Sequence, residues 1–201
     1  MIQNFWKYIL ITFLFSANLK STEYEITILA TNIANFGGIG EWSFSALLES
    51  DQESILFDTG FDENTVLHNA NLLKKDLSKV EKVILSHFHG DHTGGLIKLR
   101  KTYMSLNPRA FSDVYVAEGF FDQRFDEHGE LRGFIGGINK VSDFREKAES
   151  LKINFIVIDE AYELAPNLVL SGPVERIFES CLLYTSPSPR DVEESRMQSS
   201  A

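Results

Sequence analysis

Cysteine is almost absent from this chain of 201 residues, because Cys181 is the only one. A single cysteine excludes an internal disulfide, and it also excludes a cluster of thiolates around a metal ion. Any metal site in this protein must therefore be built from imidazole and carboxylate groups.

Positive charge is also scarce, since 19 lysines and arginines stand against 29 aspartates and glutamates and the formal net charge is −10. A chain with this balance repels phosphate backbones and offers no basic stripe for a nucleic acid to follow. We therefore expect no nucleic-acid partner, and we expect the substrate to be a small molecule.

The sequence lacks an apolar run of the ~20 residues that a stable membrane-spanning helix needs. Residues 8–15 form a shorter apolar run, which follows Lys7 and precedes the small residues Ala17 and Ser21. This order is typical of a signal peptide, so we expect residues 1–21 to be one and the protein to be exported to the periplasm or the medium. An uncleaved lipid anchor and a misassigned start codon are the alternatives.

Beyond this segment, apolar runs typical of strands alternate with amphipathic stretches typical of helices. Strands are predicted at residues 24–31, 43–49, 54–57, 82–86, 114–117, 153–158 and 167–170. Helices are predicted at residues 62–75, 96–104 and 142–151, the first of them capped by Asp62. Interleaved strands and helices indicate a layered α/β fold.

The composition changes at about Ser180. Residues 180–201 contain Ser-Pro-Ser-Pro, scattered charges and no hydrophobic period, so they have no means of joining a core. We expect a disordered or non-native tail there, either a natural extension or a translated adaptor sequence. A single globular domain is then predicted for residues 22–179.

The densest group of chemically reactive side chains is HFHGDH at residues 87–92, directly after a predicted strand. It places three imidazoles and one carboxylate within six positions. Ordinary solvated loop residues are the alternative, but four ligand-type groups at this spacing favour a metal site.

The spacing within this motif predicts two metal positions. Side chains two residues apart in an extended segment point to the same side, so His87 and His89 can bind one ion. Gly90 then lets the chain turn, so that Asp91 and His92 face a second position. We expect two divalent ions, zinc first, although iron and manganese also suit these donors. Such ions make a water molecule acidic enough to attack without a dedicated protein base.

These residues resemble the metallo-β-lactamase superfamily, whose motif His-x-His-x-Asp-His matches all four positions. The preceding ILFDTG is similar to the family's strand that ends in Asp-Thr-Gly. The resemblance implies that Asp58 lies behind the metal ions and hydrogen-bonds a ligand histidine, whereas a plain turn is the alternative. It implies four metal ligands, His87, His89, Asp91 and His92, of which Asp91 and His89 are the expected catalytic residues. The implied fold is an αββα sandwich.

Within that superfamily, ILFDTG, VLHNANLL and ILSHFHGDHTGGL are most similar to the dihydropterin-phosphate synthase-like hydrolases. The resemblance covers about residues 41–96, with a further stretch at residues 170–176. The family's later ligands have no counterpart here, which predicts a C-terminally truncated chain. His128, in a polar stretch, and His68, on a predicted helix, are expected to be surface or packing residues.

Three functions remain open on the sequence. The first is a hydrolase that uses a metal-activated water on a small-molecule ester, lactone, phosphoester or amide. The second is a pterin-linked metal-dependent transferase or synthase. The third is an inactive truncated fragment with an apolar sheet face left to water. Gly94 and Gly95 lack the lysine of a phosphate loop, so we expect them to allow close helix packing instead. The oligomeric state is not indicated.

Overall fold

The computed structural model describes residues 22–122, 124–125, 128, 131–132 and 140–173. The predicted signal peptide, the predicted tail and residues 174–176 of the resemblance lie outside them. Export and the domain boundaries therefore stay predictions. Within the described part of the chain, no helix is long and apolar enough to cross a membrane.

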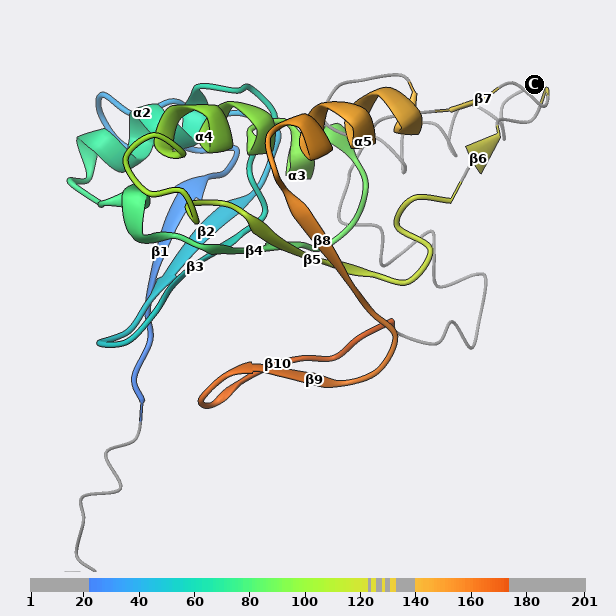
Figure 1. Cartoon of the computed structure of the whole chain (residues 1–201). Coiled ribbons are helices and arrows are strands. Elements are labelled where there is room, and N and C mark those ends of the chain that lie inside the picture. Colours follow the sequence, from blue (N-terminus) through green and yellow to red (C-terminus); the bar gives the residue numbers. More distant parts are fainter. Residues whose placement is uncertain (1–21, 123, 126–127, 129–130, 133–139, 174–201) are drawn as a thin grey trace, which may run out of the picture.

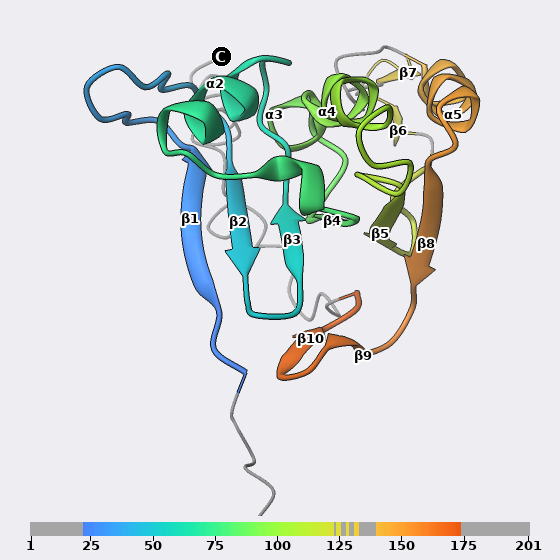
Figure 2. The ribbon, with the colours of Figure 1, turned by 60° about the vertical axis from the view of Figure 1, so that its left-hand side comes forward.

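A six-stranded sheet forms the centre of the fold, in the order β1-β2-β3-β4-β5-β8 (Figure 2). Strands β1 to β3 are antiparallel, with a long loop between β1 and β2 and a short turn between β2 and β3, whereas β3, β4, β5 and β8 are parallel and need helical crossovers. The strands are β1 (Glu25–Ala30), β2 (Ser45–Glu49), β3 (Ser54–Phe57), β4 (Lys82–Leu85), β5 (Asp113–Ala117) and β8 (Asn154–Ile158).

The helices lie together on one face of this sheet, and a hairpin lies on the opposite face (Figure 1). The helices are α2 (Thr65–Leu72), α3 (Gly90–Thr93), α4 (Leu96–Tyr103) and α5 (Val141–Ser150), with a 3-10 turn η1 (Leu77–Lys79). The hairpin is β9 (Tyr162–Ala165) with β10 (Leu168–Leu170), and a second short one pairs β6 (Arg124–Phe125) with β7 (Leu131–Arg132). The predicted α/β class is confirmed.

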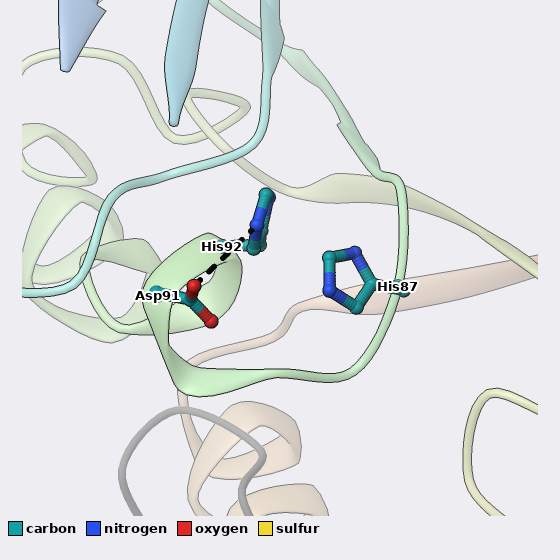
Figure 3. Close-up of side chains that lie close together, drawn as sticks. All are labelled: His87, Asp91 and His92. Carbon is teal, nitrogen blue, oxygen red and sulfur yellow. Dashed lines mark ion pairs between the residues drawn. The ribbon is translucent and has the colours of Figure 1, made fainter. Parts of the chain in front are cut away.

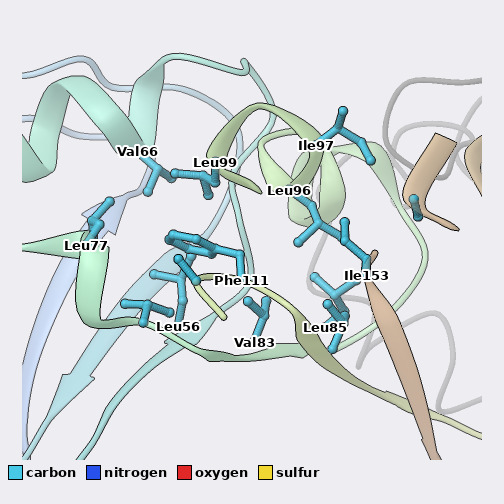
Figure 4. Close-up of a cluster of buried hydrophobic side chains, with 14 of the residues drawn as sticks. Leu56, Val66, Leu77, Val83, Leu85, Leu96, Ile97, Leu99, Phe111 and Ile153 are labelled. Carbon is cyan, nitrogen blue, oxygen red and sulfur yellow. The ribbon is translucent and has the colours of Figure 1, made fainter. Parts of the chain in front are cut away.

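Two apolar clusters hold these layers together, one on each side of the sheet. On the helix side, Leu56, Leu96 and Phe111 are fully buried in the larger cluster (Figure 4). On the other side, Ile55 packs in a smaller cluster with Leu164 of β9. Neighbouring residues of β3 thus serve opposite faces, as the alternation of a strand requires.

The structure differs from the predicted elements in several places. The predicted helix 62–75 is shorter because Asp62 accepts a hydrogen bond from Asn64 N (2.8 Å) in a turn that precedes α2, and Lys74 is left-handed (φ 57°). The predicted cap by Asp62 is therefore wrong. Helix α3 was not predicted, because four residues are too few to show a helical period, and strand β9 was not predicted, because the residues that bury it lie on other strands.

Candidate metal centre

The predicted site lies where the parallel strands β3 and β4 end side by side. Asp58 follows the last residue of β3, and Ser86 follows the last residue of β4. The chain then runs through the imidazoles into α3, which carries Asp91 and His92. Because β3 and β4 are parallel neighbours, both sets of polar residues meet at one edge of the sheet.

Three of the four predicted ligands converge in the structure. His87, Asp91 and His92 each offer a ligand atom, and these atoms lie within 4.8 Å of one another (Figure 3). The rings of His87 and His92 have centroids 4.1 Å apart, and His92 Nε2 is 3.7 Å from Asp91 Oδ2. The side chains of Asp91 and His92 keep only 17% and 13% of their surface exposed, so they are shielded but can still be reached.

His89 lies beside this group but does not belong to it. Its Nδ1 is 3.1 Å from His87 Nε2, and its backbone is the N-cap of α3. The sequence paired His87 with His89 on one ion, whereas the structure brings His87 together with Asp91 and His92. The assignment of His89 as a metal ligand and catalytic residue stays a prediction.

The turn between the two halves of the motif is helical. Gly90 is the first residue of α3 and is not among the glycines with positive φ. His89 O accepts hydrogen bonds from Thr93 N (3.2 Å) and Thr93 Oγ1 (3.0 Å), which close the turn. The expectation that glycine freedom makes this turn is therefore wrong, because an ordinary helical start re-aims Asp91 and His92.

Asp58 is a buried acceptor behind the imidazoles, with 1% of its side chain exposed. Its carboxylate lies 2.7 Å from His92 Nδ1 and accepts from Ser86 N (2.8 Å) and Ser86 Oγ (2.7 Å). Its backbone is left-handed (φ 55°), a conformation that aspartate tolerates better than most residues. The structure thus places Asp58 against a histidine of the group.

This network decides which nitrogen of each histidine faces the group. A carboxylate only accepts, so His92 Nδ1 donates to Asp58, and Nε2 is the nitrogen left to bind an ion in the neutral imidazole. Ser86 Oγ gives its one proton to Asp58, so it accepts from His87 Nδ1 at 3.0 Å. His87 and His92 therefore both present Nε2 as a ligand atom.

The backbone of α3 rests on the segment after β3. Thr59 N donates to His92 O (2.7 Å) and Gly94 N donates to Gly60 O (2.9 Å). A Cβ at Gly94 would collide with Phe61 O, and one at Gly95 would collide with Thr59 O. The predicted role of this glycine pair in close packing is confirmed.

Sequence reasoning gave Ser86 and Thr59 no role, although both contact the predicted residues. The only sequence feature that could have indicated a role for Ser86 is its position next to the motif. His68 is exposed and its Nε2 lies 2.7 Å from Gly37 O, and His128 is exposed, so both are surface residues as predicted.

The donor set fits a divalent cation. Two imidazole nitrogens and a carboxylate oxygen suit zinc, iron or manganese. Among the described residues, Asp58 and Asp91 have no lysine or arginine within 4.0 Å, and each is paired only with His92. The negative charge of these carboxylates is therefore available to a bound ion.

The chain is similar to known proteins. A family model of the metallo-beta-lactamase superfamily matches residues 43–157, which is more than half of the chain. The uncharacterized protein MJ0448 of Methanocaldococcus jannaschii is 29% identical over 154 residues, which are 77% of this chain and 55% of that protein. A synthase of the same organism, 7,8-dihydropterin-6-methyl-4-(beta-D-ribofuranosyl)-aminobenzene-5'-phosphate synthase, is 29% identical over 135 residues, or 66% of this chain and 43% of the synthase.

A solved structure supports the same relationship. Tm1679, described as a metal-dependent hydrolase of the beta-lactamase superfamily, aligns with a TM-score of 0.53 and 25% identity over 76% of this chain and 49% of that one. The chain thus spans about half the length of the relatives it matches. With the family model covering the strand ends and the motif, the chain belongs to the metallo-beta-lactamase superfamily.

Proposed function

We propose that this chain carries part of the active site of a metal-dependent hydrolase that acts on a small-molecule ester, lactone, phosphoester or amide. The observation that carries the proposal is the convergence of His87, Asp91 and His92 within 4.8 Å at the strand ends. Family membership and the likeness to Tm1679 support it.

His87, Asp91 and His92 would hold a divalent cation, and His89 would add a further imidazole for a second one. We propose zinc as the ion, with iron and manganese as the other candidates. When bound, such ions supply an acidic water molecule and polarise the bond to be cleaved.

The protein's own contribution is orientation. Asp58 orients His92 and Ser86 orients His87, so both rings are held in direction before an ion binds. Asp91 sits on the first turn of α3, whose backbone is held by Thr59 and Phe44. Asp91 and His89 are our candidates for the groups that contact the substrate.

A second candidate is the pterin-linked synthase reaction, which the likeness to the dihydropterin synthase favours. That likeness covers 43% of the synthase, and both reactions would use the same metal-binding residues. The two candidate functions therefore differ in the substrate that the protein would act on.

The test begins with metal binding by the full 201-residue chain. We expect the wild type to bind zinc or cobalt and His89→Ala to bind less, whereas His68→Ala, an exposed histidine away from the group, should bind like the wild type. Equal binding by all three proteins would contradict the predicted role of His89. Failure of the wild type to bind either ion would refute the metal centre itself.

The second step is turnover of chromogenic ester, lactone and phosphodiester substrates by the zinc-loaded chain. Hydrolysis of any of them that is lost in His89→Ala supports the hydrolase. Metal binding without hydrolysis of any substrate would favour the synthase or an inactive fragment instead.

A further inference from the structure

The carboxylate of Glu41 accepts four hydrogen bonds from other residues of the chain. Its Oε1 accepts from Ser43 Oγ (2.6 Å) and Phe61 N (2.8 Å), and its Oε2 accepts from Asp62 N (3.0 Å) and Thr65 Oγ1 (2.8 Å). The side chain is half-buried. Both oxygens are occupied by donors, so Glu41 is not arranged as a metal ligand.

Three of these hydrogen bonds, from Phe61, Asp62 and Thr65, cross between parts of the chain that are distant in the sequence, whereas the bond from Ser43 lies within the segment that carries Glu41. Ser43 belongs to the chain that leads into β2, whereas Phe61 and Asp62 belong to the chain that leaves β3. Gly60 N also donates to Phe44 O at 3.1 Å, which brings the same two segments together. Glu41 therefore fixes the spacing of the two segments with a single carboxylate.

Both segments hold α3 by its backbone. Phe44 N donates to Asp91 O at 3.3 Å, and Thr59 N donates to His92 O at 2.7 Å. Each residue of the metal-binding group that lies on α3 is thus hydrogen-bonded to one of the two segments. A change in their spacing would move Asp91 relative to His92 and both relative to His87.

We propose that Glu41 is a positioning residue of the metal centre, which acts by joining the two segments that support Asp91 and His92. This inference rests on the proposed function for its metal-binding consequence. The competing interpretation is local: Glu41 only anchors the start of α2 through Asp62 and Thr65.

The decisive variants separate the two sides of the carboxylate. Glu41→Gln turns one acceptor into a donor, and one of the backbone N–H groups of Phe61 and Asp62 then loses its partner. Ser43→Ala is milder, because it removes only a hydrogen bond that orients the carboxylate within its own segment. Thr65→Val is nearly isosteric and removes only the contact toward α2.

Two quantities are measured for each variant, the affinity for Co²⁺ and the hydrogen exchange of the Phe44 and Thr59 amides. We expect Glu41→Gln to weaken Co²⁺ binding by about tenfold, as orienting residues around metal ligands do, with a smaller loss in Ser43→Ala. Exchange at Phe44 and Thr59 should accelerate in both variants. Thr65→Val should lower the melting temperature without changing either quantity.

The inference is overturned if Glu41→Gln and Thr65→Val lower the melting temperature alike while Co²⁺ affinity and exchange at Phe44 and Thr59 match the wild type. If the wild type binds no Co²⁺, the proposed function fails, and exchange still decides the role of Glu41. Should Glu41→Gln not fold, Glu41→Asp, whose shorter side chain draws the carboxylate away from the Phe61 and Asp62 amides, gives the same decision.

Discussion

The carboxylates at the two ends of the parallel pair β3 and β4 have different partners. At the amino-terminal end, Lys82 Nζ lies 2.8 and 2.7 Å from the two carboxylate oxygens of Glu53. Close by, Lys75 Nζ lies 2.6 Å from Glu25 and 2.7 Å from Glu49. At the carboxyl-terminal end, Asp58 and Asp91 gather with imidazoles instead.

This difference in partners indicates a structural role for one end and a metal-binding role for the other. Glu53, Glu25 and Glu49 at the amino-terminal end are each paired with a lysine, which stabilises the sheet. Carboxylates at the other end have no such cation among the described residues, and their partners are groups that can also bind a metal. Substitutions at either end of the two strands test this difference.

Asp58→Ala should have the largest effect. We expect a loss of about 2 kcal/mol in the free energy of unfolding, because Ser86 N and His92 Nδ1 lose a buried acceptor. Metal affinity should fall by roughly 10- to 100-fold, because His92 is no longer oriented. Urea denaturation and metal titration measure the two effects. Asp58→Asn, which tolerates the left-handed backbone, is the control for strain.

Lys82→Met at the opposite end should cost about 1 kcal/mol, since the pair with Glu53 is only partly exposed. Metal affinity should not change, because Lys82 opens β4 while the metal-binding residues follow its last residue. Urea denaturation and Co²⁺ titration check this prediction. A clear loss of metal affinity would show that the two ends are not independent.

Lys75→Met should have a smaller effect that depends on pH. The hydrogen bond and charge of Lys75 hold the pKa of Glu25 below its usual value, and Glu25 and Glu49 raise the pKa of Lys75. The interaction therefore stabilises the fold between the usual pKa values of glutamate and lysine. It is lost as pH falls through the lowered pKa of Glu25 or rises through the raised pKa of Lys75.

Melting temperatures of the wild type and Lys75→Met test this dependence. The difference between them should be largest near neutral pH, and it should shrink near pH 3 and again above the usual pKa of lysine, about 10.4. A difference that is the same at every pH would show that Lys75 contributes by packing and not by charge.

Lys79→Ala should have the smallest effect. Its Nζ lies 3.7 Å from Asp76 Oδ2, and both side chains are more than half exposed, at 72% and 54%. Such pairs contribute below about 0.5 kcal/mol. Urea denaturation should therefore barely distinguish this variant from the wild type, and a larger loss would contradict the classification of this pair as solvent-screened.

Much of the fold could be predicted because its signals are local. The strand at residues 54–57 was predicted with its observed bounds, and those of β4, β5 and β8 differ by one residue. The four motif residues were found from spacing alone. Strand β9 was missed because its burial comes from Ile55 and Ile84, which lie far away in the sequence.

Three of the four predicted ligands lie together in the structure, but not in the predicted pairs. The spacing of an extended chain predicted that His87 and His89 bind one ion. In the structure, α3 brings Asp91 and His92 close to His87 instead. Glu41 was not predicted either, because its partners lie two to 24 residues away and no periodic pattern marks them.

The sequence by itself determined the ligand types, the α/β class and the position of the motif after a buried strand, because composition and period act over a few neighbouring residues. The fold was needed to show that His92 is the histidine that Asp58 contacts and that Glu41 joins two loops. Those contacts depend on β3 and β4 lying side by side, and strand pairing is set by the whole core rather than by either strand.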